Sequence, residues 1–184
     1  YRQIFYGLSL AIGTQISRFG NFIISANYGN DEVKNIKESP ISNYKMTLTT
    51  LKTSLSIDTH DKYPYPLTGV KLNAYYETAQ TLLGGELGYT DFNMNYSIYY
   101  SLNENHTFST SLRFAFADKT LPLSRQYSLG GQYSFFGMRE NEYRGRQILK
   151  SSFEYRVLLP FQLFFNTYYL SFNLFSFLLC LCCF

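Results

Sequence analysis

The sequence predicts an all-β protein, an antiparallel transmembrane β-barrel of which this chain holds about eight strands. Three observations favour this class: a recurring alternation of apolar and polar residues, the length of the alternating segments, and a shortage of charge. Charged residues make up 16% of the chain and aromatic residues 19%, whereas soluble domains carry about 25% charge. A soluble domain of this composition would expose large apolar patches, but a barrel turns them toward lipid.

The alternation is clear from the first segment, where Leu8, Leu10 and Ile12 are separated by Ser9 and Ala11. The alternating segments are mostly about ten to fourteen residues long. Strands of globular sheets have about five or six residues, and strands that cross a bilayer need about nine to eleven. Segment length therefore favours a membrane barrel over a soluble sandwich or a lipocalin-like barrel. Within these segments the alternation is clearest over 4–16, 22–28, 44–57, 70–77, 89–101, 108–116, 149–157 and 164–172.

The connections alternate between short turns and long polar loops, as they do in outer-membrane barrels. Within 44–57 the apolar phase slips at Thr49-Thr50, which predicts a β-bulge because one extra residue reverses the two faces. Leu159-Pro160-Phe161 predicts a tight turn before the last segment. His60 and His106 lie in turns, and we expect them to be solvated.

Several classes of function find no support in the residues. A net charge of +3 provides no electrostatic footprint for nucleic acid. No Gly-x-Ser-x-Gly sequence occurs, and two turn histidines suggest no Ser/His/Asp arrangement. The three cysteines all lie within the last five residues, without a histidine nearby to complete a metal site. We therefore expect no catalytic residue, cofactor or metal in this chain.

The connection over 119–146 is too long for a hairpin, which needs only two to five loop residues. It combines glycine, aromatic, acidic and basic residues, so we expect it to pack inside the structure that the strands enclose. Its conspicuous residues are Gly130, Gly131, Phe136, Gly137, Arg139, Glu140, Arg144 and Gly145.

From about Thr50 to Phe172 the chain resembles the bacterial surface antigen superfamily of outer-membrane barrels, which includes BamA, TamA and the two-partner secretion transporters. Their Asp-rich periplasmic turn ending in Pro-x-x-Gly is matched by four residues here. Their Gly-Gly-x4-Arg-Gly-aromatic loop, which folds into the lumen, is matched by Gly130-Gly131, but Phe136 replaces the arginine. The resemblance implies about sixteen strands, with this chain holding about the sixth to the thirteenth. The turn residues are Asp58, Asp61, Pro66 and Gly69.

The barrels attached to patatin-like phospholipases are more similar in this loop, since they read Gly-aromatic-Arg-x-x-Glu-Leu-x-Gly where this chain reads 137–145. This resemblance implies a bacterial outer-membrane barrel that anchors or translocates a phospholipase passenger encoded upstream. Its partners would be outer-membrane lipid, the barrel assembly machinery and the fused hydrolase domain. Arg139 or Arg144 would then hold the loop in the lumen. The alternatives are an assembly or secretion factor of the BamA and TamA type, or a simple porin-like barrel.

The expected domain organisation is a partial barrel over 1–175, with 119–146 as its lumen-plugging loop. Because the chain begins at Tyr1 and shows no signal peptide, we expect a fragment. Residues 176–184 are an atypical apolar, cysteine-rich tail. Three interpretations of this tail stay open: an altered or frameshifted end, a terminal strand ending in Phe184, and a short transmembrane helix.

Overall fold

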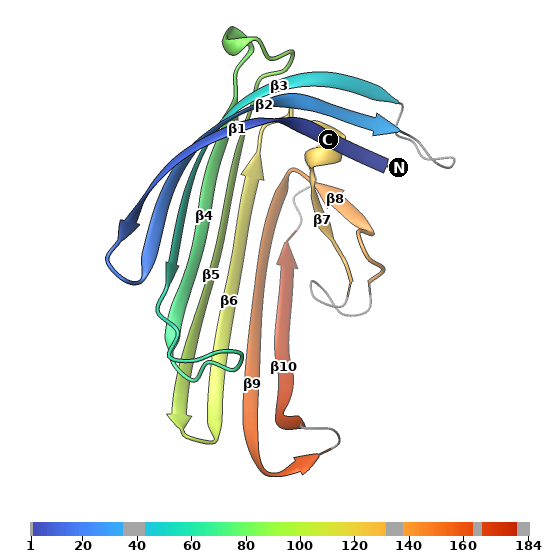
Figure 1. Cartoon of the computed structure of the whole chain (residues 1–184). Coiled ribbons are helices and arrows are strands. Elements are labelled where there is room, and N and C mark those ends of the chain that lie inside the picture. Colours follow the sequence, from blue (N-terminus) through green and yellow to red (C-terminus); the bar gives the residue numbers. More distant parts are fainter. Residues whose placement is uncertain (1, 35–42, 132–137, 164–166, 180–184) are drawn as a thin grey trace.

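The computed structural model describes residues 2–34, 43–131, 138–163 and 167–179. Eight long strands form one antiparallel sheet in the order β1-β2-β3-β4-β5-β6-β9-β10, so each long strand pairs with the long strand that follows it in the sequence. The sheet curves into an arch, an open part of a barrel wall (Figure 1). The strands are β1 Arg2–Ile16, β2 Gly20–Lys34, β3 Tyr44–Asp58, β4 Gly69–Ala79, β5 Tyr89–Asn103, β6 His106–Ala117, β9 Gln147–Leu163 and β10 Thr167–Leu179.

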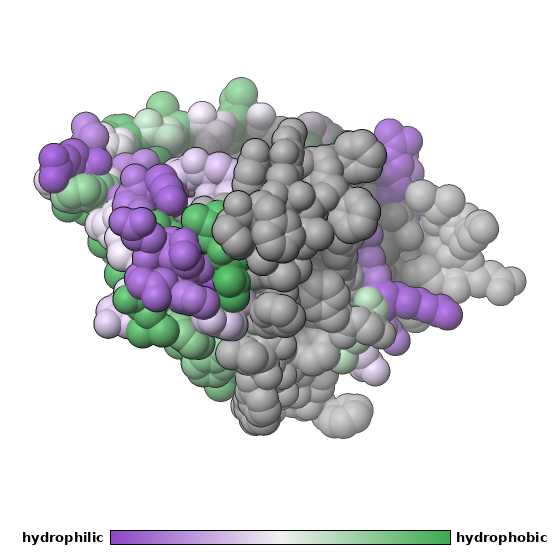
Figure 2. Space-filling model, turned by 90° about the horizontal axis from the view of Figure 1, so that it is seen from below, coloured by the Kyte–Doolittle hydropathy of each residue, from purple (hydrophilic) through white to green (hydrophobic). Residues whose placement is uncertain are grey.

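The predicted alternation separates an apolar outer face from a polar inner face. On β1 the side chains of Leu8, Leu10 and Ile12 are 80%, 72% and 77% exposed on the outer face. The inner face carries a polar row, in which Ser9 Oγ donates to Asn27 Oδ1 at 2.6 Å and Asn27 Nδ2 donates to Thr50 Oγ1 at 3.2 Å. Seen from below, a hydrophilic patch is bordered by hydrophobic residues along the outline of the molecule (Figure 2).

The predicted β-bulge at Thr49-Thr50 is wrong, because β3 pairs with β2 and β4 without a register shift at this point. The apolar phase changes for another reason. Leu48 is buried on the inner face, whereas Leu51 lies exposed on the outer face. The inner face is apolar at this end of β3 because the loop packs against it, so the phase change marks where the loop covers the wall.

The predicted tight turn at Leu159-Pro160-Phe161 is also wrong, since β9 continues to Leu163. Beyond Val157 this strand has no paired residue in β6. Its pairing with β10 shifts register between Thr167 and Tyr169. Proline has no N–H for a ladder hydrogen bond, so within sheets it occurs at edges and irregularities. Pro160 is tolerated because it has no paired residue in the described parts of β6 or β10.

The end of β10 includes the first part of the predicted tail. Residues 176–179 pair with Ser152 to Leu149 of β9. The three cysteines at 180–183 lie outside the described residues. No helix in the described part of the chain is long and apolar enough to cross a membrane.

The connection between β6 and β9 carries its own small elements. The 3-10 helix η2, Leu123–Arg125, is followed by the strand β7, Tyr127–Leu129, which pairs with β8, Tyr143–Gly145. The connection turns back against the inner side of the arch (Figure 1).

Candidate functional site: the loop against the inner wall

Apolar side chains fix the first half of loop 119–146 to the inner wall. Leu121 and Leu129 of the loop are buried against inward residues of the sheet, among them Leu48 and Ile148. Burying a leucine side chain is worth about 1.5–3 kcal/mol, so this contact accounts for much of the loop's attachment. The buried cluster consists of Leu48, Ala79, Tyr89, Ala115, Ala117, Leu121, Tyr127, Leu129 and Ile148.

Arg125, at the end of η2, connects the loop to acidic residues on separate strands. Its Nη1 lies 2.8 Å from Glu77 Oε1 on β4 and 2.6 Å from the Tyr89 hydroxyl on β5. Its Nε lies 3.8 Å from Asp31 Oδ2 on β2. The guanidinium also lies over the Phe5 ring of β1, at 5.4 Å from its centroid. One cation therefore contacts four strands of the sheet from the loop.

Neighbouring hydroxyl groups complete the hydrogen bonding of these acids. The Tyr89 hydroxyl donates to Glu77 Oε1 at 2.6 Å. Ser124 Oγ donates to Asp31 Oδ2 at 3.2 Å and accepts a hydrogen bond from the Tyr44 hydroxyl. Asp31 is fully buried, and a buried carboxylate is tolerated only when it is paired and hydrogen-bonded.

A third acid, Asp91 on β5, accepts hydrogen bonds from two tyrosines, one on the loop and one on β4. The Tyr127 hydroxyl of the loop donates to Asp91 Oδ1, and the Tyr75 hydroxyl of β4 donates to Asp91 Oδ2 at 3.2 Å. Burial raises the pKa of Tyr127, and the adjacent Asp91 carboxylate raises it further. Tyr127 therefore stays a neutral donor. We call Arg125, Ser124 and Tyr127 with Asp31, Glu77 and Asp91 the loop clamp.

The sequence interpretation did not single out Arg125. It named Arg139 and Arg144 as the residues that hold the loop. The Arg139 side chain is exposed, and its backbone N–H donates to Glu142 Oε2 at 2.8 Å. Arg144 Nη1 donates to the Leu123 carbonyl at 3.3 Å, a contact inside the loop. The role of these two arginines stays a prediction, whereas the described ion pairs from loop to sheet belong to Arg125.

The other predicted loop residues lie around the hairpin. Glu140 is exposed and approaches Gly131, while Gly145 is buried and pairs with Tyr127. Phe136 and Gly137 lie outside the described residues. Arg125 precedes the Gly-Gly pair, so the family motif does not include it. The signal that could have found it is the group of acids on the inner face, which needs a cation to be buried.

Gly130 can only be glycine in this hairpin. Its φ is +115°, and a Cβ there would lie 1.9 Å from the Arg139 carbonyl oxygen. Gly84, between β4 and β5, has φ +87°, but a Cβ there would meet no other described atom within 4 Å. Comparing alanine substitutions at the two positions therefore separates the effect of backbone strain from the effect of steric collision.

We expect Gly130→Ala to force the 138–142 segment away from the loop clamp, whereas Gly84→Ala incurs only left-handed strain of about 1–2 kcal/mol. Proteinase K digestion of the complete protein in lipid vesicles measures this. Cleavage between 131 and 145 should rise at least about tenfold in Gly130→Ala, and cleavage between 80 and 88 should change less in Gly84→Ala. Equal changes would show that the collision is relieved without moving the loop.

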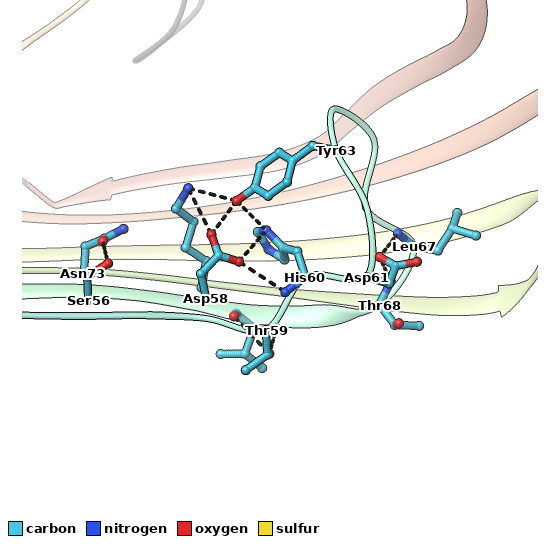
Figure 3. A network of polar contacts seen from close by, with 11 residues as sticks. Ser56, Asp58, Thr59, His60, Asp61, Tyr63, Leu67, Thr68 and Asn73 are labelled. Carbon is cyan, nitrogen blue, oxygen red and sulfur yellow. Dashed lines mark hydrogen bonds and ion pairs between the residues drawn. The ribbon is translucent and has the colours of Figure 1, made fainter. Parts of the chain in front are cut away.

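At the opposite end of the sheet, the turn between β3 and β4 is held by its own aspartates (Figure 3). Asp58 accepts hydrogen bonds from the Tyr63 hydroxyl and, at 3.1 Å, from the backbone N–H of His60. Gly69 has φ +123°, and a Cβ there would lie 2.6 Å from the Thr59 carbonyl oxygen. Three of the four predicted turn residues thus act within this turn: Asp58, Asp61 and Gly69.

The fourth, Pro66, connects the turn to a distant strand. Its carbonyl accepts a hydrogen bond from Arg156 Nη1 of β9 at 3.5 Å, and the Arg156 guanidinium lies 5.6 Å from the Tyr65 ring. The turn therefore folds under the arch. His60 is carried inward with it, so the expectation that it is solvated is wrong: its side chain is 4% exposed and its ring meets Tyr99 edge-on at 4.9 Å.

Asp61 makes the turn sensitive to acid. Its Oδ1 accepts hydrogen bonds from the backbone N–H groups of Leu67, at 2.9 Å, and Thr68, at 3.2 Å. Burial acts to raise the pKa of Asp61, but these hydrogen bonds outweigh it and hold the pKa below its ordinary value. A carboxyl group with a lowered pKa contributes stability above its unfolded pKa, and this stability is lost as the pH falls through the folded pKa.

We therefore expect amide exchange at Leu67 and Thr68, corrected for its intrinsic pH dependence, to accelerate once the pH falls below about 4. Asp61→Asn keeps an acceptor oxygen but cannot titrate, so its corrected exchange should not vary with pH. The same acid-induced acceleration in Asp61→Asn would assign the effect to another group.

No group of three or more His, Cys, Asp or Glu side chains in the described ranges is placed to hold a metal ion. The arrangement of the described residues supports attachment of a loop to a wall.

An antiparallel arch of long strands, apolar outside and polar inside with a loop folded against its inner wall, defines an outer-membrane type of β-barrel. The chain belongs to the Omp85 superfamily, whose domain matches residues 1–176. This confirms, at the superfamily level, the resemblance drawn from the motifs. The comparison with curated proteins gave no match.

Among solved structures, the chain is similar to BamA from Haemophilus ducreyi, in a crystal structure that lacks POTRA domains 1–3. The TM-score is 0.76 with 17% sequence identity, and the match covers 86% of this chain and 38% of that chain. The two share their fold, and the chain spans less than half of the length of the protein that it matches.

Proposed function

We propose that this chain is a segment of a bacterial outer-membrane barrel in which loop 119–146 braces the inner wall, and that the barrel anchors or translocates an attached protein. The observation that carries this proposal is the loop clamp. Arg125 joins the loop to Asp31 and Glu77 on separate strands, which makes the loop part of the wall's support. The apolar outer face supplies the surface that lipid requires.

The passenger that we propose is a patatin-like phospholipase. This proposal is supported by the spacing of Arg139, Glu142 and Gly145 in the loop, which resembles the barrels attached to such enzymes. The test uses cells that express the complete protein. Outer membranes are separated on a sucrose gradient, and release of fatty acid from phosphatidylethanolamine is measured with and without the protein. Absence of the protein from this fraction would refute the barrel, and its presence without lipase activity would refute the passenger.

A second candidate is an assembly or secretion factor of the BamA type, which the likeness in fold to BamA favours. Depletion of the complete protein should then lower the outer-membrane content of other barrels within a few generations. The lipase form of the proposal expects other barrels to stay at their normal level. A simple porin-like barrel made by these strands alone would instead refold in detergent as an isolated chain into a heat-modifiable species.

A further inference from the structure

Between the loop and the turn, the inner wall is hollowed by a polar cavity of about 230 Å³. Above it, Tyr127 of the loop is bonded to Asp91. Below it, the turn reaches β9 through Pro66 and Arg156. The cavity therefore lies in the middle of the wall, between the two attachments. It is lined by Asn95, Tyr96, Ser97, Ser111, Leu112, Arg113 and Lys150.

The register of β5, β6 and β9 arranges the polar lining side chains in rows. Arg113 stands opposite Asn95 on one side and opposite Lys150 on the other. In the next inward row, Ser111 stands opposite Ser97 and Ser152. The hydroxyl groups of Ser111 and Ser152 lie 2.5 Å apart. Two cations, an amide and hydroxyl groups thus occupy adjoining positions on one face.

The charges of this cavity are of one sign. Arg113 and Lys150 face each other across neighbouring strands, an arrangement that destabilises a sheet when both residues are charged. No carboxylate is among the residues that line the cavity. The acids of the lining strands β5 and β9 are engaged elsewhere: Asp91 with Tyr127 and Tyr75, and Glu154 with Arg156 and Ser109.

Arg113 is further constrained by its surroundings. Its Nε is buried without a hydrogen-bond acceptor among the described residues. Its guanidinium carbon lies 5.9 Å from the centroid of the Tyr127 ring, so the loop limits the directions that the side chain can take. The guanidinium is therefore held at the cavity beside Lys150, where a bound anion would relieve the repulsion between the two cations.

We propose that this cavity is a binding site for an oxyanion, a phosphate or carboxylate group, a role that goes beyond the proposed anchoring function. The planar Arg113 guanidinium matches two oxygens of such a group, Lys150 supplies a point charge, and the serine and asparagine side chains supply neutral donors. The anion can come from solution or from the headgroup of an acidic lipid, because both present the same oxygens.

The test is isothermal titration of the complete protein, in a non-ionic detergent at low ionic strength. Inorganic phosphate is the probe in one arm, and a short-chain phosphatidic acid below its micelle concentration is the probe in the other. Arg113→Gln and Lys150→Gln should each weaken binding at least tenfold. Lys45→Gln removes the same charge from the outer face of β3 and should leave binding unchanged. Heat-modifiable migration of each variant in gels shows that the barrel has folded.

Saturable phosphate binding that is lost in both variants supports a site for free anions. Binding of phosphatidic acid alone, again lost in both variants, supports a site for lipid headgroups. Absence of saturable binding in both arms would overturn the proposal, as would equal affinity in the wild type and the two variants. Arg113→Lys keeps the charge but loses the planar guanidinium that can bind two oxygens. The difference in affinity between this variant and the wild type therefore measures the contribution of the planar geometry.

Discussion

Replacing Arg125 with alanine is expected to release loop 119–146 from the inner wall, at a cost of about 3 kcal/mol in the attachment of the loop. The reason is electrostatic. Asp31 is fully buried and Glu77 nearly so, and both face Arg125. Removing the cation takes the Arg125 ion pair away from two carboxylates in a site shielded from water. The apolar contacts of Leu121 and Leu129 remain, but they must then offset this penalty.

Proteinase K cleavage of the complete protein in lipid vesicles measures the release, because this protease does not depend on the arginines that are changed. Cleavage within 119–146 should rise at least about 100-fold in Arg125→Ala, as a cost of about 3 kcal/mol implies. Glu77→Gln in the same background should recover part of the protection, since it removes one uncompensated charge.

The matched controls are Arg139→Ala and Arg144→Ala, which remove the same charge from the same loop. From the sequence, replacing the pair of them is expected to loosen the loop, whereas from the described ion pairs we expect the larger effect at Arg125. If the double Arg139→Ala, Arg144→Ala variant were cleaved as fast as Arg125→Ala, the loop would be held by the hairpin as much as by the loop clamp.

The second large effect is expected at Leu10 on β1. Leu10 is on the outer face near the middle of its strand, so Leu10→Arg places a charge in lipid, at a cost of about 2–4 kcal/mol near the bilayer midplane. Urea-dependent unfolding of the complete protein from lipid vesicles gives this difference. The expected result is a lower midpoint and slower insertion of the variant into vesicles.

Ser9→Arg is the matched control, because it introduces the same side chain one residue away on the opposite face. Ser9 bonds to Asn27 in the polar inner row, so the new charge would lie in an aqueous or polar environment. The variant should unfold close to the wild type, within about 0.5 kcal/mol. Equal destabilisation by the two substitutions would show that the outer face of β1 is not in contact with lipid.

Much of the sheet could be predicted from the sequence, because a strand with lipid on one side and a polar lumen on the other must alternate. Each of the eight predicted segments overlaps one of the eight strands of the sheet, but the predicted boundary between the last two is displaced, because β9 continues to Leu163. The predicted bulge was wrong because the inner face there contacts neither lipid nor the polar lumen but the packed loop. Leu48 is apolar on the inner face because the loop covers it, and alternation alone indicates a bulge at such a change.

The attachment of the loop could be predicted only in outline. Its length and composition indicated a buried loop, and Glu77 and Asp91 could be placed on the polar face from the alternation. The partner of Glu77 could not be predicted. Arg125 reaches Glu77 from the short 3-10 helix η2, and the alternation of residues along the chain gives no sign of this helix. The family motif directed attention to Arg139 and Arg144, which follow the Gly-Gly pair, whereas the described ion pairs from loop to sheet come from Arg125, five residues before that pair.

Chemical labelling at Ser124 tests most directly the central claim that the loop is held on the inner wall. In the complete protein, with Cys180, Cys182 and Cys183 replaced by serine, Ser124→Cys is compared with Leu82→Cys, whose side chain is 94% exposed between β4 and β5. Intact cells are treated with a membrane-impermeant maleimide. We predict that Cys at position 82 reacts within minutes while Cys at position 124 stays unlabelled, and that Arg125→Ala makes position 124 reactive. Rapid labelling of position 124 with Arg125 in place would contradict the account.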